Sequence, residues 1–232
     1  AQRRLWLVDQ LGRGSVQYNM AGKSHMLGEF NVEAFKLALE TLIERHEILR
    51  TTYQSHDEYP VQVIQQNVVL PFGCEDLSEL EPSVKAAKAQ ERAELEAIAP
   101  FNLAEDLMLR VKVLKLEHNS HYILYTMHHI ASDGWSMGIF SKELSALYNA
   151  YKDNNANPLP PLKFQYADYA MWQKGWLKDE VLGKELNFWK SQLAGIPALH
   201  SLPLDGSRPG RQTFEGRQLS VRFEQALSDR LY

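Results

Sequence analysis

The 232-residue sequence has a single cysteine, Cys74, so an intramolecular disulfide and a metal site built from several cysteines are both excluded. Long apolar runs are also absent, and none approaches the roughly 20 residues that a membrane-spanning helix needs. The net charge is −4, which gives no electrostatic basis for binding nucleic acid. Neither a signal peptide nor an internal repeat is visible. We therefore expect a cytoplasmic protein that binds neither membranes nor nucleic acid.

The composition is that of an ordinary globular protein. Hydrophobic residues make up 44% of the chain and charged residues 23%. The length suffices for a sizeable core in one domain or two small ones. The chain starts at Ala1 instead of methionine, and its last residues, Leu227 to Tyr232, have a helical pattern without a stop signal. We expect it to be a piece of a longer polypeptide.

Helical and strand-like patterns are mixed along the chain. Asn31 is a good N-cap for a helix with one apolar face, and two alternating segments around a polar turn at 117–120 predict an antiparallel hairpin. The predicted helices span 32–50, 82–98, 137–152 (capped by Ser136), 166–177 and 180–193, and the predicted strands 61–64, 107–116, 121–127 and 217–223. The polar, Pro-rich segment 154–161 is the best linker candidate. Because hairpins replace a regular βαβ rhythm, we expect an α+β fold or an α/β fold with a mixed sheet.

The segment that follows the second hairpin strand carries the chemistry. His128 and His129 end the apolar run, Asp133 follows His129 at i+4, and Gly134 comes next. Imidazole is the side chain best suited to moving protons near neutral pH. A histidine at a strand end, followed by a carboxylate and a glycine, is the layout expected of a catalytic loop. A metal site is disfavoured, because adjacent strand residues diverge and no HExxH or further ligand cluster is present.

Five motifs together resemble the condensation domains of nonribosomal peptide synthetases. The segment 128–134 is similar to the family's HHxxxDG signature, and 1–6 (AQRRLW) to its opening motif AQxRLW. The segments 45–53, 166–172 and 202–209 are similar to RHExLRTxF, YxDYAxW and LPxD…RP, with Tyr53 in place of phenylalanine. The resemblance covers the whole chain but only about the first half of the family's domain. Tyr18-Asn19 and the sequence around the histidines look most like the subtype that joins two L-configured residues.

The resemblance implies a two-lobed fold like that of chloramphenicol acetyltransferase, with the catalytic loop at the floor of a tunnel between the lobes. Residues 1–177 would form the N-terminal lobe, and 178–232 the crossing helix and the beginning of the C-terminal lobe. The implied reaction is amide formation between a donor thioester and an acceptor aminoacyl thioester. Both are held on the 4'-phosphopantetheine arms of upstream and downstream peptidyl carrier proteins, next to an adenylation domain. The resemblance implies no intrinsic cofactor, and a monomeric module within a multidomain chain.

The resemblance also assigns roles to the loop residues. His129 would accept a proton from the attacking amine or steady the developing charge, and the sequence leaves these two roles open. His128 would point to the opposite side and support the loop. Asp133 would form a structural ion pair with Arg45 or Arg50, although both arginines have an alternative interpretation as surface cations near a helix end. Gly134 would adopt a backbone angle closed to other residues, or let a substrate arm pass.

Four further residues are candidates for the substrate channel: Trp135, Ser136, Tyr166 and Trp172. The competing interpretation for the aromatic residues of 166–189 is packing within the lobe. For His46, on the apolar stripe of its helix, we favour a packed, hydrogen-bonded histidine. The alternative functions are an epimerisation domain, a coenzyme A-dependent HxxxD-type acyltransferase, and a non-catalytic recruitment module.

Overall fold

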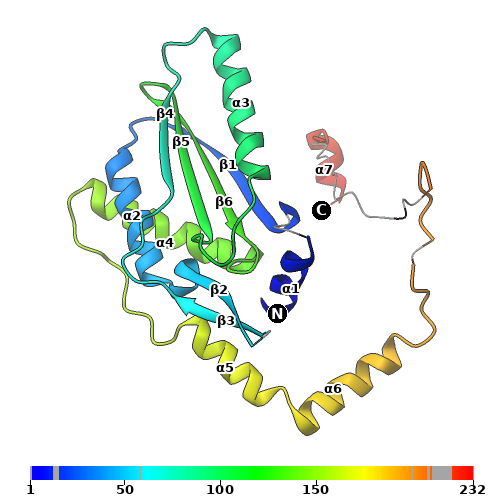
Figure 1. Ribbon diagram of the computed structural model, residues 1–232. Helices are drawn as coiled ribbons and strands as arrows, with labels where there is room; N and C mark the ends of the chain where they lie inside the picture. Colours follow the sequence, from blue (N-terminus) through cyan, green and yellow to red (C-terminus); the bar gives the residue numbers. More distant parts are fainter. Residues whose placement is uncertain are drawn as a thin grey trace. The chain divides into compact units, whose positions relative to one another are not determined.

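A four-stranded mixed sheet lies at the centre of the compact unit that spans residues 1–186 (Figure 1). The computed structural model describes residues 2–12, 16–57, 59–199, 201–207, 210 and 221–231. The sheet has the order β1-β6-β5-β4, formed by β1 (Asn19–Leu27), β6 (Ser120–His128), β5 (Leu109–Glu117) and β4 (Phe72–Asp76). β6 is antiparallel to both of its neighbours, whereas β4 runs parallel to β5. The expected mixed sheet is therefore present, and it contains one unexpected βαβ unit, in which α3 (Pro82–Ile98) joins β4 to β5.

The predicted hairpin is confirmed. β5 and β6 pair antiparallel, with Val113 opposite Ile123. The predicted helix 82–98 is confirmed with the same bounds, and a proline at its first turn fits its start. The hairpin places the end of β6, and with it the two histidines, in the middle of the sheet.

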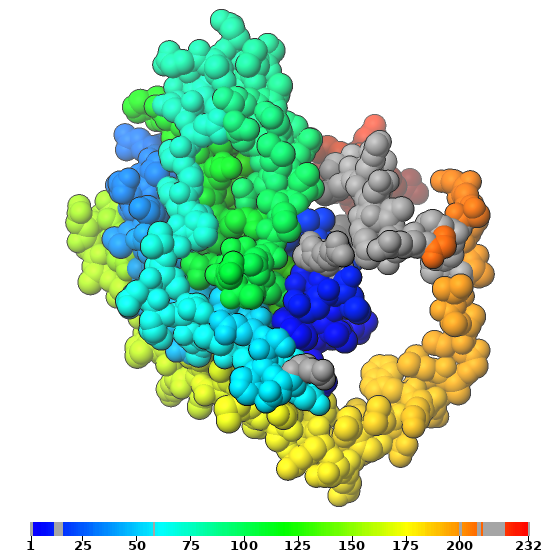
Figure 2. All heavy atoms as spheres, in the orientation of Figure 1, coloured from blue at the N-terminus to red at the C-terminus, as the bar shows by residue number. Residues whose placement is uncertain are grey.

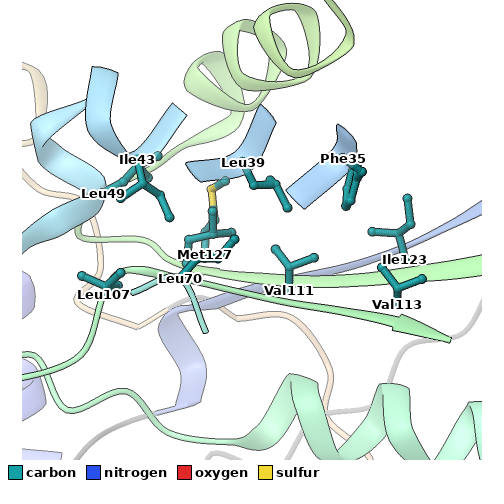
Figure 3. Packing of buried hydrophobic residues seen from close by; sticks show 11 residues of the cluster. Phe35, Leu39, Ile43, Leu49, Leu70, Leu107, Val111, Val113, Ile123 and Met127 are labelled. Atoms are coloured by element: carbon teal, nitrogen blue, oxygen red, sulfur yellow. The ribbon is translucent and has the colours of Figure 1, made fainter. Parts of the chain in front are cut away.

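Helices cover both faces of the sheet (Figure 1). On one face, α2 (Val32–Arg45) and α4 (Gly134–Lys152) pack on the odd-numbered residues of β5 and β6. Figure 3 shows this cluster, in which the side chains of α2 meet those of the two strands; its buried members are Phe35, Leu39, Ile43, Leu49, Leu70, Leu107, Leu109, Val111, Val113, Ile123 and Met127. On the other face, α3 packs Ala89 on Leu114 and Leu124. Both central strands are buried on both faces, which fixes the position of the loop that follows β6.

The predicted helix 32–50 is wrong in its last turn. α2 starts after Asn31, whose Oδ1 accepts from the Ala34 N–H, and it ends at Arg45. His46 is extended (ψ 95°), and a 3₁₀ turn, η2 (Glu47–Arg50), follows. The chain then enters a two-stranded sheet formed by β2 (Thr51–His56) and β3 (Tyr59–Ile64). The strand prediction for 61–64 is therefore confirmed as part of a longer strand.

The remaining helices and 3₁₀ turns before residue 193 are α1 (Gln2–Gly12), η1 (Val16–Tyr18), α5 (Tyr166–Trp176) and α6 (Asp179–Gln192). The α1 helix packs Trp6 against Tyr53 and Ile130, and Figure 2 shows it in dark blue against the cyan atoms of β2 and β3. The segment predicted as a linker has no regular structure, but Leu159 packs on the cluster of Ala38, Leu42 and Leu147. It is therefore attached to the core.

The chain divides into two compact units, Ala1–Leu186 and Asn187–Tyr232, with α6 crossing the division. In the second unit the described residues include α7 (Gln225–Leu231), where a helix was expected, and none of them is buried. The predicted strand 217–223 lies mostly outside the described residues, and 221–223 have no regular structure. Across the described part of the chain, every helix is too short or too polar to cross a bilayer. The lobe boundary at residue 177 stays a prediction.

Candidate active site

The loop that follows β6 is held by backbone hydrogen bonds on two sides. The His128 N–H donates to the Met108 carbonyl at 3.2 Å, just before β5, and the His129 N–H donates to the Tyr18 carbonyl at 2.9 Å, just before β1. The loop then turns back on itself, because the Ala131 N–H donates to the His128 carbonyl at 3.0 Å. The two histidines therefore sit where the neighbouring strands begin.

The His129 ring is exposed, and its proton arrangement is set by one contact. Its Nδ1 lies 2.7 Å from the Ser132 carbonyl oxygen. A carbonyl oxygen can only accept a hydrogen bond, so Nδ1 must carry a proton. In the neutral imidazole the lone pair is then on Nε2. The loop thus presents a basic nitrogen on the side of the ring away from its anchor.

His128 is the opposite case, a buried histidine that stays neutral. Its side chain is 1% exposed and lies beside the ring of Phe101, with centroids 5.7 Å apart. Burial, with smaller contributions from His129 and Arg110, lowers the pKa of His128 to about 4. Its Nδ1 accepts from the Ile130 N–H at 3.1 Å. One histidine is buried and the next is exposed, as strand alternation predicts.

Asp133 caps α4, and the predicted cap Ser136 is wrong. The Asp133 carboxylate accepts from the Ser136 N–H at 2.8 Å, while the Asp133 N–H donates to Ser136 Oγ at 2.7 Å. This is a capping box with Ser136 in the N3 position, so α4 begins three residues earlier than predicted. The bond from the Ser136 backbone holds the pKa of Asp133 below its usual range. The carboxylate therefore fixes the end of the loop to the start of a helix.

The predicted ion pair between Asp133 and Arg45 or Arg50 is wrong. The Arg45 Nε is 3.1 Å from Glu143 of α4, and its Nη1 donates to the Pro160 carbonyl. Arg50 donates to the Gln65 carbonyl at 2.7 Å and lies 3.7 Å from Glu47. Both arginines point to groups near the end of α2, whereas Asp133 accepts the free N–H groups at the start of α4.

Glu143 is a residue that the sequence patterns did not single out. Besides Arg45, its Oε2 lies 2.6 Å from His46 Nε2. The interpretation of His46 as a packed, hydrogen-bonded histidine agrees with this contact. Burial alone would raise the pKa of Glu143, but the bonds from His46 and Arg45 outweigh it and hold the pKa below its usual range. Glu143 thus ties the end of α2 to the helix that follows the loop.

Gly134 does not adopt the predicted left-handed backbone. In the described part of the chain, the glycines with positive φ are Gly28 and Gly195. Gly134 is the first residue of α4, and a β carbon added to it would meet no atom within 4 Å. The open space at this position leaves the other expectation, a close approach by a substrate arm, as a prediction.

The four channel candidates do not form one cluster. Trp135 is 83% exposed and, with Ser136, lies in the first turn of α4 beside the loop. Tyr166 is half-buried at the start of α5, and burial, with smaller contributions from Tyr169 and Asp133, raises the pKa of its phenol. Trp172 lies further along α5, where its ring stacks on Trp176 with centroids 5.5 Å apart. Both indoles are about half exposed, so in this chain they are not packed within the lobe.

The sequence patterns also missed the support beneath the loop. Gln2 of α1 donates from Nε2 to the Ile130 carbonyl at 2.9 Å and to the Tyr53 hydroxyl at 2.8 Å. A small cavity of about 120 Å³ lies next to the loop and is lined mainly by apolar side chains, with Ala131, Ser132 and Phe140 among its walls. Among the residues that the structure describes, no group of three His, Cys, Asp or Glu side chains could hold a metal ion.

Comparison with known proteins gives one family over the whole chain. The profile of the family described as "Condensation domain" matches residues 1–232. A linear gramicidin synthase of Brevibacillus parabrevis is 41% identical over 99% of this chain, which corresponds to 4% of that protein. The chain thus spans a small fraction of the length of this curated relative.

Two solved structures agree with this family in fold. The X-domain from teicoplanin biosynthesis is 29% identical with a TM-score of 0.77, and the match covers 90% of this chain and 45% of that one. The same kind of domain in a complex with OxyB is 30% identical with a TM-score of 0.75, over the same shares. The mixed α/β fold described above therefore matches about half of each solved chain.

Proposed function

The chain belongs to the condensation-domain family, and from that premise we propose that it forms the histidine-bearing half of an enzyme that joins two carrier-bound substrates through an amide bond. The observation that carries the proposal is the His129 ring: it is exposed, Nδ1 donates to the Ser132 carbonyl, and among the residues that the structure describes no group bonds Nε2. A neutral imidazole held in a single tautomer is what a general base requires.

The proposed reaction proceeds in two proton transfers around one tetrahedral intermediate. The neutral amine of the acceptor attacks the carbonyl carbon of the donor thioester, and a C–N bond forms. His129 Nε2 accepts the proton that the amine sheds. When the intermediate collapses, the C–S bond breaks, and the imidazolium returns the proton to the thiolate that leaves on the donor's pantetheine arm. The product is an amide on the acceptor's carrier, with no metal or redox group needed.

His128 and Asp133 support this reaction without touching the substrates. Buried His128 stays neutral near pH 7, so it adds no positive charge beside the ring that must accept a proton. Asp133 fixes the last residue of the loop to the start of α4. We assign both residues to positioning, and Trp135, exposed beside them, to the wall along which a substrate approaches.

Substitution of His129 tests the proposal and distinguishes a role as proton acceptor from a role that only positions the amine. In the complete condensation domain with two charged carrier proteins, His129→Ala should lower the rate of amide formation by about 10²–10⁴. His129→Gln places an amide oxygen near the former Nε2, so it can accept a hydrogen bond but cannot carry the proton away. We expect both variants to lose the same fraction of the rate of amide formation, because the proposed role is proton transfer. His118→Ala, at an exposed turn, is the matched control and should leave the rate unchanged.

The results distinguish the alternatives. Activity retained by His129→Gln but lost in His129→Ala would reassign the histidine to positioning the amine. Turnover by His129→Ala at the wild-type rate would remove the catalytic assignment. If the wild-type domain yields D-configured aminoacyl carrier or an acyl product from coenzyme A thioesters in place of the amide, then the epimerisation or the stand-alone acyltransferase function replaces the proposed one.

We also propose the setting in which the reaction occurs. The family resemblance supports a two-lobed parent domain like chloramphenicol acetyltransferase, with residues 1–177 as the N-terminal lobe, and upstream and downstream carrier proteins and an adenylation domain as its neighbours. Subtype motifs favour two L-configured partners. A chirality test with L- and D-aminoacyl donors decides the subtype, because this subtype should use the L donor and reject its enantiomer.

A second candidate function is a recruitment module that binds a partner protein without catalysis. The observation in its favour is the solved teicoplanin X-domain, which is 30% identical and forms a complex with OxyB. Against it stands the loop of this chain, in which both histidines and the Nδ1 contact are in place. A wild-type domain that binds partners but makes no amide would favour this second function.

A further inference from the structure

Most hydrogen bonds of the catalytic loop are made within the loop or to the ends of neighbouring strands. One carbonyl, that of Ile130, instead accepts a hydrogen bond from α1, a segment distant in the sequence. His129 N–H, His129 Nδ1, Ile130 N–H and Ala131 N–H all have partners in the loop or at the strand ends. The Ile130 carbonyl, one residue after the catalytic histidine, instead accepts from Gln2 Nε2 at 2.9 Å. This contact joins residues that are 128 positions apart in the sequence.

The three contacts of the Gln2 amide define its orientation. Its nitrogen donates to two acceptors, the Ile130 carbonyl and the Tyr53 hydroxyl, and its oxygen accepts from Gln62 Nε2 at 2.7 Å. Turning the amide over would set its oxygen against the Ile130 carbonyl, which can only accept, so the amide nitrogen must face Ile130. The Tyr53 hydroxyl and the Gln62 amide can each donate or accept, so the site requires above all a side chain that donates to the Ile130 carbonyl.

The surroundings of this amide are rigid. Tyr53 is 3% exposed, and burial, with a smaller contribution from Tyr166, raises the pKa of its phenol above its usual range, so it stays neutral at any working pH. Trp6, on the same helix as Gln2, packs with Tyr53 and Ile130 in one buried cluster. The apolar contacts seat α1 on the loop, and the amide sets the position of the loop's backbone.

We propose that Gln2 is a positioning residue for the catalytic histidine. It acts through the Ile130 carbonyl, which it holds in the place that lets the four-residue loop close between His129 Nδ1 and the Ser132 oxygen. Without it, the peptide between Ile130 and Ala131 keeps only the bond from the Ala131 N–H to the His128 carbonyl, so its position is held less firmly, the Nδ1 contact weakens, and the lone pair of His129 is no longer confined to Nε2. This inference rests on the proposed function for its kinetic consequence, but its structural consequence does not.

The kinetic test uses the complete condensation domain with charged carrier proteins. Gln2→Ala removes the amide and leaves Trp6 in place, so the helix should stay docked. We expect kcat to fall about 10- to 100-fold with KM within twofold, because a shift of about 1 Å in a catalytic group costs about that much in rate. Gln2→Glu sets a carboxylate against the Ile130 carbonyl and should be at least as slow. The matched control is Gln10→Ala, the same substitution on the exposed face of α1.

A spectroscopic test separates positioning from simple stabilisation. The ¹⁵N shifts of His129 report which ring nitrogen carries the proton. The wild-type protein should show the Nδ1–H form, and Gln2→Ala a mixture of both forms, with Gln10→Ala unchanged. If Gln2→Ala does not fold, the same measurement is made on Gln62→Ala. This variant removes only the donor to the Gln2 oxygen, so a smaller change in the tautomer ratio is expected.

Two outcomes overturn the proposal. One is an unchanged kcat in Gln2→Ala, and the other is a lost kcat with the His129 tautomer intact, which would give Gln2 a role elsewhere. A wild-type domain that makes no amide would instead remove the proposed function, and the tautomer comparison would still decide the role of Gln2.

Discussion

Burial and hydrogen bonding set the roles of single residues in the loop. For His128, the effect of burial can be measured as a dependence of the free energy of unfolding on pH. An unfolded histidine titrates near 6.5, whereas burial lowers the pKa of His128 to about 4. Between these two pKa values His128 is protonated in the unfolded chain but neutral in the folded protein. The free energy of unfolding must therefore fall as the pH falls. The contribution is fully present above about pH 6.5, and its loss amounts to about 3 kcal/mol by pH 4.

The measurement is urea unfolding at several pH values between 7 and 4. His128→Asn keeps an acceptor for the Ile130 N–H and has no group that titrates in this range. The variant should be less stable at pH 7, and its stability should decline by about 3 kcal/mol less than that of the wild type on acidification. Carboxylates titrate in both proteins, so the difference isolates the histidine. Parallel curves for the two proteins would show that position 128 binds its proton as readily folded as unfolded.

At the same scale, Asp133 shows that sequence patterns can locate a carboxylate without identifying its hydrogen-bond partner. The motif placed the candidate catalytic loop, and the structure brings His128, His129 and Asp133 together there. A carboxylate before a helix has two ways to be satisfied, an arginine from elsewhere or the free N–H groups of the helix, and the sequence alone does not choose between them. The residues DGWS, with serine three positions after aspartate, contained the signal for a capping box.

At the scale of elements, one cluster of charged side chains holds α4, the helix that follows the histidine loop, against the end of α2. Glu143 of α4 meets Arg45 and His46 at the end of α2, with side chains between 12% and 21% exposed. Glu143→Ala should lower the free energy of unfolding by about 1–3 kcal/mol, because it leaves Arg45 Nε and His46 Nε2, both largely buried, without their acceptor. Glu40→Ala, in the exposed Lys36–Glu40 pair, is the control and should change stability by less than about 0.5 kcal/mol. Equal effects in chemical unfolding would refute this role of the charged cluster.

In the four-stranded sheet, the two strands that the sequence predicted are central, and the two that it did not predict are the edges. β5 and β6 are central, and their buried side chains give a clear apolar pattern. β1 and β4 are the edges, and their sequences, NMAGKSHML and FGCED, are polar and contain glycine. Gly22 in β1 is required by its partner, because a β carbon there would overlap the Tyr125 ring of β6. Edge strands form here because a buried strand provides the pairing, which local sequence does not reveal.

The end of α2 illustrates the same limit for helices. The apolar stripe continues as far as Leu49, but the chain leaves the helix after Arg45. In the structure, His46 turns its imidazole to Glu143 almost a hundred residues away, and the backbone follows. A tertiary contact overrides local helix propensity at this point. Helix α3 also receives long-range hydrogen bonds at its end, such as that from Asn19 to the Ala97 carbonyl, but its backbone stays helical there and its bounds are those predicted.

At the scale of the whole molecule, the buried core is confined to the first two thirds of the chain. In the described residues the buried side chains run from Trp6 to Leu147. Beyond α4, the chain still contributes a few contacts: Pro160 accepts from Arg45, Leu159 packs on Leu147, and the Gln165 side chain bonds the Arg45 carbonyl and the Glu47 N–H. These contacts all precede Leu177, the predicted end of the first lobe.

Truncation therefore tests where the folding unit ends. A chain that stops after Leu177 keeps every buried residue and every contact just named, so its free energy of unfolding should be within about 1 kcal/mol of that of the 232-residue chain. A chain that stops after Asn157 loses the three hydrogen bonds to Arg45 and Glu47 and should be less stable by about 1.5–4.5 kcal/mol, given about 0.5–1.5 kcal/mol for each hydrogen bond lost. Both are measured by urea unfolding at low protein concentration, because the exposed indoles of Trp172 and Trp176 favour association. If the chain ending at Leu177 were as unstable as the shorter one, residues 178–232 would have to bury apolar surface of the first lobe, and the lobe boundary at 177 would be wrong.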